Sequence, residues 1–267
     1  MDAGAILAAY DREMRADPAP EAGVERVWVD GVLRTLGAYD FIGWWDFRPA
    51  RAAEIAAREA DFFRKRGAGA EWKVFSHDHP AHLEAALAEA GWTGQEAETF
   101  VAFDMEEGMP PADRAAGLEI REARDRAGLA DFLAVNAAAF ARPARQTVEE
   151  LERAIHDPGL AYFVAYREGR PVASGGLHLA PGRAFAGLYS GGVVPDQRGR
   201  GAYRALVAAR AEQARRLGYR YLFVDARETS RPILERLGFL PLATIRGWTI
   251  EAPPSPLAGE GVGEADG

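Results

Sequence analysis

The chain has 267 residues, of which 48% are hydrophobic, so it is long enough to bury one large core or two ordinary ones. Its formal net charge of −8 argues against nucleic acid or an anionic membrane as a general partner. It contains no cysteine, which excludes disulfides, thiolate metal ligands and a cysteine nucleophile.

Two features of the N-terminal half suggest other roles at first sight. His77, His79 and His82 are close in sequence, but they span a strand end and a helix start without a fixed ligand geometry, so we expect no metal site. The apolar run at residues 5–10 is too short for a signal or membrane segment and lacks a basic lead-in. We therefore expect a cytoplasmic protein with no membrane partner.

The first half alternates between strand-like and helix-like stretches, separated by glycine and proline. The expected elements are, in chain order, a strand at 41–47, a helix at 50–65, a strand at 72–75, a helix at 81–90 and a strand at 99–105.

Residues 106–113 are acidic and proline-bearing, which is typical of a linker. The sequence thus predicts one domain at 1–108 and another at 116–251. The tail at 252–267 has too little apolar content to fold alone and is expected to be disordered.

The second half has a longer series of elements, of mixed α/β type. They are a strand at 118–123, helices at about 126–140 and 147–155, strands at 162–166 and 171–177 around a hairpin turn at 168–170, a strand at 184–194, a helix at 202–217, a strand at 219–225, a helix at 230–237 and a strand at 239–250.

A glycine-rich, arginine-bearing turn joins the strand ending at Val194 to the helix starting at Ala202. Gly199 and Gly201 carry no Cβ, so their N–H groups can converge on one point, toward which the helix directs its positive dipole end. A dinucleotide fingerprint would need a small residue at the sixth position, and a nucleotide P-loop would need Gly-Lys-Ser/Thr. Neither pattern fits, and the turn is expected to bind another anion of the diphosphate type.

The turn resembles the acyl-CoA-binding loop of the GNAT superfamily of N-acetyltransferases, Arg/Gln-x-x-Gly-x-Gly/Ala, which maps onto Arg198, Gly201 and Tyr203. Tyr203 departs from the small residue of that pattern. The corner at 234–239, Leu-Glu-Arg-Leu-Gly-Phe, also resembles the superfamily's helix-to-strand corner. The resemblance implies an α/β fold of the α+β type with a mixed sheet.

The resemblance further implies direct transfer of an acetyl group from acetyl-CoA, the co-substrate, to a small-molecule or protein amine. Backbone N–H groups around Val193 and Val194 would contact the acetyl carbonyl and pantetheine. The loop from Gly199 through Arg200, Gly201 and Ala202 to Tyr203 would bind the diphosphate. Arg198 and Arg200 lie in the loop itself, whereas Arg210, Arg215 and Arg216 are interpreted as an exposed helix face.

The superfamily often places a tyrosine acid at a position that is Leu234 in this chain, so the usual acid is absent. Tyr189 is our first choice to replace it, and Glu228 is a candidate general base. Other polar residues that could take part are Ser190, Ser230 and His178, and two residues could contact the acceptor, Asn136 and Asp225.

The first half repeats the element order of the second, with Gly91-Trp92 in the place of Gly238-Phe239. Its link at 48–50, Arg-Pro-Ala, has no glycine, and Pro49 has no N–H to offer an anion. We expect tandem GNAT-like domains, of which the first is degenerate and binds no cofactor. The alternative is an unrelated α/β domain with a similar element order.

Two other functions remain open at this point. One is a CoA-binding regulatory or sensor protein without catalysis, and the other is an interaction scaffold whose loop binds no cofactor. The acceptor amine and the oligomeric state are not indicated by the sequence.

Overall fold

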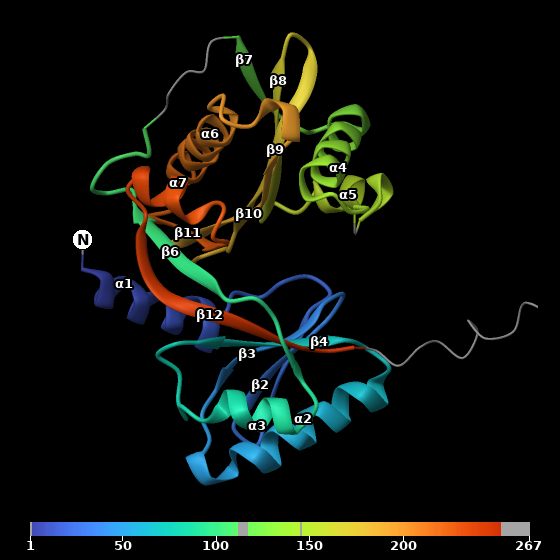
Figure 1. Ribbon diagram of the computed structural model, residues 1–267, viewed down its shortest axis with the longest axis vertical. Coiled ribbons are helices and arrows are strands. Elements are labelled where there is room, and N and C mark those ends of the chain that lie inside the picture. Colours follow the sequence, from blue (N-terminus) through green and yellow to red (C-terminus); the bar gives the residue numbers. More distant parts are fainter. Residues whose placement is uncertain (1, 112–116, 145, 252–267) are drawn as a thin grey trace, which may run out of the picture. The chain divides into compact units, whose positions relative to one another are not determined.

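The computed structural model describes residues 2–111, 117–144 and 146–251 (Figure 1). The chain forms two compact units. Unit 1 contains the described residues up to Pro20 together with Glu98–Ala243, and unit 2 contains Glu21–Ala97 and the described residues from Thr244 onward. Each unit has its own hydrophobic core.

The sheet of unit 1 has the strand order β6-β11-β10-β9-β8-β7. All neighbours are antiparallel except β10 and β11, which are parallel. The strands are β6 (Glu98–Asp104), β7 (Leu118–Glu122), β8 (Leu160–Arg167), β9 (Arg170–Leu179), β10 (Phe185–Val193) and β11 (Tyr221–Ala226).

Helices cover both faces of this sheet, with α4 and α5 on one side and α6 and α7 on the other (Figure 1). Their bounds are α4 (Arg126–Phe140), α5 (Val148–Ala154), α6 (Ala202–Arg216) and α7 (Arg231–Arg236). Unit 1 also contains the N-terminal helix α1 (Ala3–Tyr10) and a π-helical turn at Asp11–Ala16. Tyr10 packs its ring against Phe100, Phe185 and Phe223, which fixes α1 to the strands of this unit.

Helix α4 begins where the sequence places a side-chain cap. Asp125 has extended backbone angles and its carboxylate accepts a hydrogen bond from the Gly128 N–H at 2.8 Å. This bond satisfies one of the N–H groups that the first helical turn leaves without an intrahelical acceptor. The cap therefore fixes the start of a helix that, further along, contacts the central strands.

We expect Asp125→Ala to lower the free energy of unfolding by about 1 kcal/mol, because the cap is lost while no buried group is removed. Urea denaturation followed by far-UV circular dichroism measures the change. Glu119→Ala, on the exposed side of β7, is the control and should stay within about 0.5 kcal/mol of the parent. An unchanged stability in Asp125→Ala would mean that the cap does not hold α4 in place.

Unit 2 has the strand order β1-β2-β3-β4-β12 and packs helices against one sheet. Strands β3 and β4 are parallel, and the other neighbours are antiparallel. Its elements are β1 (Glu25–Val29), β2 (Val32–Leu36), β3 (Asp40–Trp45), a 3-10 turn (Pro49–Arg51), α2 (Ala52–Arg66), β4 (Ala70–Phe75), α3 (Leu83–Glu89) and a short β5 (Thr93–Gly94) that pairs with β12 (Leu240–Ile250).

The two units repeat one pattern of connections, which confirms the tandem architecture expected from the sequence. The series β1-β2-β3-α2-β4-α3 corresponds to β8-β9-β10-α6-β11-α7, with two antiparallel pairs followed by one parallel pair in each. Strands β1, β2 and β5, helix α1 and the π-helical turn were not expected from the sequence, whereas the helices and strands that were expected begin and end within a few residues of their expected positions.

The compact units do not follow the domain boundary expected at residues 106–113. Strand β6, from the first half of the sequence, pairs with β11 over residues 99–104, and residues 245–250 of β12, from the second half, pair with β4. Each half of the sequence thus contributes its last strand, wholly or in part, to the other unit. The backbone hydrogen bonds of these strands determine which unit each strand belongs to, because an unpaired buried strand would leave its N–H and C=O groups without partners. The expected tail at 252–267 lies outside the described residues.

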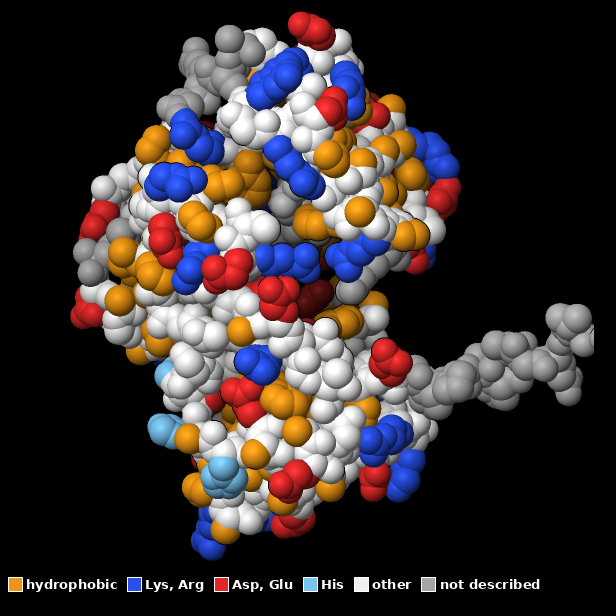
Figure 2. Space-filling model, viewed as in Figure 1, with side chains coloured by type: hydrophobic (Ala, Val, Ile, Leu, Met, Phe, Trp, Pro, Cys, Tyr) orange, Lys and Arg blue, Asp and Glu red, His pale blue; other side chains and the backbone are white. Residues whose placement is uncertain are grey.

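Within the described part of the chain, no helix has both the length and the apolar composition needed to cross a membrane. The same residues contain no group of three or more His, Asp or Glu side chains placed to hold a metal ion. On the face shown in Figure 2, basic side chains are interspersed with acidic and apolar ones.

Candidate functional site

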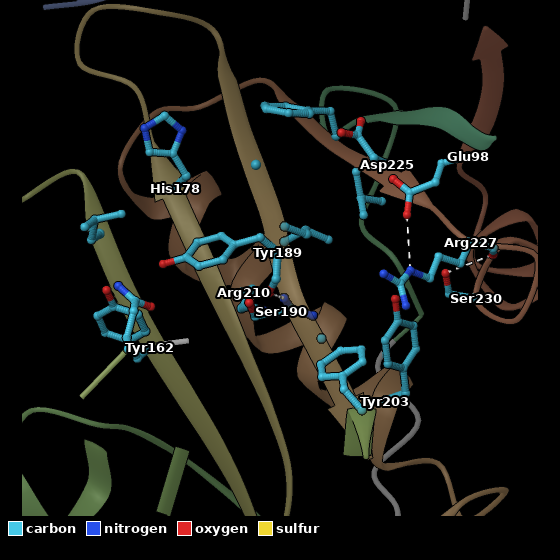
Figure 3. A pocket seen from close by; sticks show the side chains of 18 of the residues that line it. Glu98, Tyr162, His178, Tyr189, Ser190, Tyr203, Arg210, Asp225, Arg227 and Ser230 are labelled. Carbon is cyan, nitrogen blue, oxygen red and sulfur yellow. Dashed lines mark hydrogen bonds and ion pairs between the residues drawn. The ribbon is translucent and has the colours of Figure 1, made fainter. Parts of the chain in front are cut away.

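The two parallel strands of unit 1 separate after a short stretch of pairing. Strands β10 and β11 pair only over Phe185–Gly187 and Tyr221–Phe223, yet β10 continues to Val193 and β11 to Ala226. A pocket of about 590 Å³ lies where they separate (Figure 3). Its lining from these two strands includes Leu188, Ser190 and Gly191 on one side and Val224 and Asp225 on the other.

Strand β10 has a bulge at the edge of this pocket. Its register with β9 passes from Tyr189 to Gly192 with a shift, and Ser190 has a positive φ of 49°. Such a bulge redirects backbone groups out of the ladder. The Asn136 side chain on α4 donates hydrogen bonds to the Ser190 carbonyl at 3.0 Å and to the Ser174 hydroxyl at 3.2 Å. Asn136, which we had considered as an acceptor contact, therefore holds the bulge in place.

The loop before α6 has the geometry expected of an anion cradle. Gly199 and Gly201 have φ values of 73° and 82°, which L-residues with a side chain rarely adopt. The N–H groups from Gly199 to Tyr203 donate no hydrogen bond to any other residue that the structure describes. A Cβ at Gly199 would meet nothing within 4 Å, so the loop is open on this side.

Arginine side chains brace the loop from two directions. Arg198 donates to the carbonyl of Ala139, in the last turn of α4, at 2.9 Å and to the carbonyl of Val193 at 3.3 Å. Arg167 at the end of β8 donates to the Gln197 side chain at 2.7 Å and to the Arg200 carbonyl at 3.2 Å. Arg198 is thus occupied with protein carbonyls, whereas the Arg200 guanidinium makes only a long contact of 3.4 Å with Gln197 among the described residues.

Val193 and Val194, both expected to contact the cofactor through N–H groups, differ in the structure. The Val194 N–H donates to the Val172 carbonyl at 3.0 Å and is therefore engaged. Residues alternate their backbone groups between the two sides of an antiparallel strand, so the backbone groups of Val193 face away from β9. The contact of its carbonyl with Arg198 agrees with this orientation.

The Tyr203 ring points away from the loop amides and into the pocket lining. It packs against β10 where a Cβ on Gly191 would lie 3.1 Å from the ring. Its hydroxyl points toward Arg227 and Ser230 (Figure 3). Burial raises the pKa of this hydroxyl, and the Arg210 charge and a hydrogen bond with Ser230 offset part of that shift. The bulky ring therefore does not cover the cradle.

Tyr189 projects from β10 between His178 and Tyr162 (Figure 3). Its buried hydroxyl makes no hydrogen bond within 3.5 Å to any described residue. Burial, and next the neighbouring Tyr162, raises the pKa of this hydroxyl well above its usual range. Tyr189 is thus neutral at physiological pH, so it can donate a hydrogen bond but is a weak proton donor.

Arg210 was interpreted from the sequence as part of an exposed helix face, and this was wrong. The residue is 1% exposed and lines the pocket from α6. Its guanidinium donates to the carbonyls of Leu206 at 3.1 Å, Gly176 at 3.0 Å and Tyr189 at 3.4 Å. The signal that could have identified it is its spacing, since Arg210 lies four residues from both Leu206 and Ala214, which are fully buried.

The structure brings some of the candidate catalytic residues together and leaves one outside. Tyr189, His178, Ser230 and Asp225 line the pocket. Glu228 does not line it, and its largely exposed carboxylate instead pairs with Arg231 at 3.1 Å. This placement argues against Glu228 as a general base.

Several lining residues were missed by the sequence reasoning because they come from distant elements. Glu98 at the start of β6 pairs with Arg227 at 3.2 Å, and Phe140 and Arg142 come from the end of α4. Both arginines, Arg142 and Arg227, lie near the face of the Phe140 ring. No local sequence pattern marks these residues as part of a site. Glu98 reaches the pocket only because β6 pairs with β11.

The region that contains this loop and all of the pocket lining except Glu98 matches a family model. Residues 125–239 match the model described as "Acetyltransferase (GNAT) family". These residues form a GNAT acetyltransferase domain. The resemblance drawn from the loop and from the corner at 234–239 is thereby confirmed.

Relatives extend the similarity beyond the GNAT domain. The chain is 29% identical over 251 residues to a mycothiol acetyltransferase of Acidothermus cellulolyticus, covering 80% of this chain and 75% of that one. A GCN5-related N-acetyltransferase of Kribbella flavida matches the fold with a TM-score of 0.66 at 17% identity, covering 96% of each chain. A tandem GNAT protein from the clavulanic acid biosynthesis pathway matches with a TM-score of 0.58 at 17% identity, covering 93% of this chain and 88% of that chain. The two solved structures support the tandem fold.

Proposed function

We propose that this protein is an acetyl-CoA-dependent N-acetyltransferase acting on an amine. The observation that carries the proposal is the row of loop amides from Gly199 to Tyr203, which have no protein acceptor among the described residues. The last of these residues, Tyr203, lines the pocket between β10 and β11. Unused N–H groups at a helix start, with positive φ at Gly199 and Gly201, suit a diphosphate. A cytoplasmic location is part of this proposal.

The chain offers groups for each part of such a co-substrate. The amides of Gly199, Arg200, Gly201, Ala202 and Tyr203 would hold the diphosphate, and the exposed Arg200 guanidinium would add a positive charge. The Val193 N–H would bind the pantetheine arm, whereas the Val194 N–H is occupied by Val172. Bound in this way, the thioester would supply an activated acetyl carbonyl to the pocket.

The polar side chains of the pocket then serve proton transfer. An attacking amine must lose a proton as its nitrogen bonds to the thioester carbon, and the sulfur departs as a thiolate with the electron pair of the C–S bond. Asp225 on β11 lines the pocket and is our choice to accept the amine proton, in place of Glu228. The Tyr189 and Ser230 hydroxyls would donate hydrogen bonds to the reacting groups, with Tyr189 held neutral by its raised pKa.

The acceptor is proposed to be a small molecule that carries a primary amine. The pocket is lined by aromatic rings and by charges of both signs, including Glu98, Arg142 and Arg227, which suits a polar molecule more than an extended peptide. The similarity to a mycothiol acetyltransferase supports a small-molecule acceptor, and a protein amine is the second candidate.

Unit 2 is proposed to bind no acetyl-CoA. In the place of the glycine loop it has Pro49 at the start of the helical turn, which offers no N–H. Arg51 in the same turn donates to Asp30 at 2.7 and 2.5 Å and to Glu54, so the arginine nearest this link is neutralised by the protein's own carboxylates. The relatives named above do not favour a regulatory protein without catalysis.

Release of free CoA thiol in the presence of a panel of amines tests this proposal. We expect thiol release that depends on both acetyl-CoA and a small primary amine, with the acetylated amine detected by mass spectrometry. Acetyl-CoA binding without turnover on any amine would support the regulatory alternative. Absence of binding would contradict both and leave an interaction scaffold.

A further inference from the structure

Arg210 is a charged side chain buried in unit 1 without a carboxylate partner. Its three hydrogen-bond acceptors are the backbone carbonyls of Leu206, Gly176 and Tyr189, and no ion pair joins it to an Asp or Glu in the described parts of the chain. Burial lowers its pKa to about 10, and the neighbouring groups that act against this shift are the Tyr203 and Tyr189 hydroxyls. A buried cation that only neutral groups contact is costly to a folded protein.

Unit 2 shows how the same fold neutralises a buried charge. Helix α2 has the place in unit 2 that α6 has in unit 1, and its Glu59 is 0% exposed. Arg34 donates to the Glu59 carboxylate at 2.6 and 3.0 Å, and Arg58 adds a third contact. Unit 1 buries Arg210 at an equivalent helix with no such counter-ion among the residues that the structure describes, which indicates that its charge serves something other than stability.

One nitrogen of the guanidinium takes no part in these backbone hydrogen bonds. Nε and Nη1 make the three bonds to carbonyls, whereas Nη2 makes no hydrogen bond to a described residue. Nη2 lies 3.6 Å from the position that a Cβ on Gly191 would occupy, and Gly191 lies at the bulge of β10. The Tyr203 ring lies 3.1 Å from the same position, so glycine at 191 leaves room for both the guanidinium and this ring. Gly191, Tyr203 and Arg210 all line the pocket.

We propose that Arg210 stabilises the negative charge that develops on the thioester oxygen during acetyl transfer, acting through Nη2 beside Gly191. This inference rests on the proposed function. The amine nitrogen forms a bond to the carbonyl carbon while the C=O π pair moves to oxygen. When that pair returns, the C–S bond breaks, its electrons leave with sulfur, and the amine proton passes to the pocket carboxylate.

The physical reason is that charge develops in a site with a low dielectric constant. A fixed cation there interacts more strongly with a new negative charge than it would in water and needs no reorganisation. The uncharged thioester of the bound state gains little from the same cation. Arg210 therefore should affect kcat more than the affinity for acetyl-CoA.

Arg210→Ala tests the proposal in the full chain. We expect kcat to fall by about 100-fold, as for the loss of one donor to a developing oxyanion, while the KM for acetyl-CoA changes less than about threefold. Added methylguanidinium should restore activity by at least about tenfold, because the truncated side chain opens onto the pocket. Arg210→Lys should retain more activity than Arg210→Ala. Arg215→Ala, on the exposed side of α6, should match the parent with and without methylguanidinium.

A second variant keeps the proposal open to refutation if Arg210→Ala does not fold. Gly191→Ala leaves the arginine itself unchanged and places a methyl group 3.6 Å from Nη2 and 3.1 Å from the Tyr203 ring. Because this crowds the guanidinium at the bulge, we expect kcat to fall by at least about tenfold. The proposal is overturned if folded Arg210→Ala keeps its kcat, loses only acceptor or acetyl-CoA affinity, or gains nothing from methylguanidinium. Full kcat in Gly191→Ala would also overturn it. Failure of the proposed function is distinguishable, because the parent protein itself would then release no CoA.

Discussion

Gly201→Glu should abolish acetyl-CoA binding, with at least about a 100-fold loss in affinity. The substitution places a negative side chain beside the amides that we assign to the diphosphate, and it forces a residue with a Cβ into a backbone with a φ of 82°. Titration calorimetry with acetyl-CoA measures the loss directly.

A matched control separates the effect of the loop from the effect of strain. Gly182 has a φ of 68° in the turn between β9 and β10, and a Cβ at this residue would meet nothing within 4 Å. Gly182→Glu adds the same charge and similar strain away from the loop and should bind acetyl-CoA like the parent. Equal affinity in Gly201→Glu and the parent would remove the loop from the site.

Glu59→Ala should destabilise unit 2 by about 3–5 kcal/mol. Glu59 is fully buried, and its removal leaves Arg34, which is 8% exposed, as an unpaired buried charge. The Arg34 guanidinium also lies 3.7 Å from the centre of the Phe62 ring, so it is packed in place and cannot simply turn to solvent.

Tryptophan fluorescence reports this loss for one unit alone. The chain has six tryptophans, and all of them, Trp28, Trp44, Trp45, Trp72, Trp92 and Trp248, belong to unit 2. The urea midpoint of the fluorescence transition should fall in Glu59→Ala. Glu54→Ala removes an exposed partner of Arg51 and should cost less than about 1 kcal/mol. A similar small cost in Glu59→Ala would mean that the buried pair contributes no net stability.

The sequence predicted the elements of the second half because their signals are local. The helix expected at about 126–140 is α4 within those bounds, and the glycine-rich turn leads directly into α6. Gly218 and Gly238, both with positive φ, end helices where the pattern placed the breaks. Helix starts and glycine breaks depend on residues that are close in sequence, so they can be recognised without knowing the fold.

The exchange of strands between the two halves could not be predicted, because strand pairing is a long-range choice. Nothing in residues 99–104 indicates that they pair with β11, more than a hundred residues later, instead of with β4. The same pairing brings Glu98 to the pocket, which is why it was missed. Strands β1 and β2 differ, because a local signal does mark them. Asp30 and Gly31, both with positive φ, form the turn between two apolar runs, and this hairpin could have been predicted from the sequence.

The candidate site was predicted in part. The loop glycines were identified because only glycine suits such a backbone, and the structure gives both a positive φ. Arg210 was misplaced because its charge was taken to indicate exposure, although its spacing from Leu206 and Ala214 puts it on the buried side of α6. Glu228 was chosen from its position after β11, and its side chain pairs with Arg231 away from the pocket lining.

The most direct test of the central claim follows the loop amides themselves during binding. In ¹H–¹⁵N spectra of labelled protein, acetyl-CoA should shift the resonances of Gly199, Arg200, Gly201, Ala202 and Tyr203 and slow their exchange with solvent. The amide of Val194, already bonded to Val172, should keep its exchange rate. Binding that leaves the five loop amides unchanged, or no binding at all, would contradict the account.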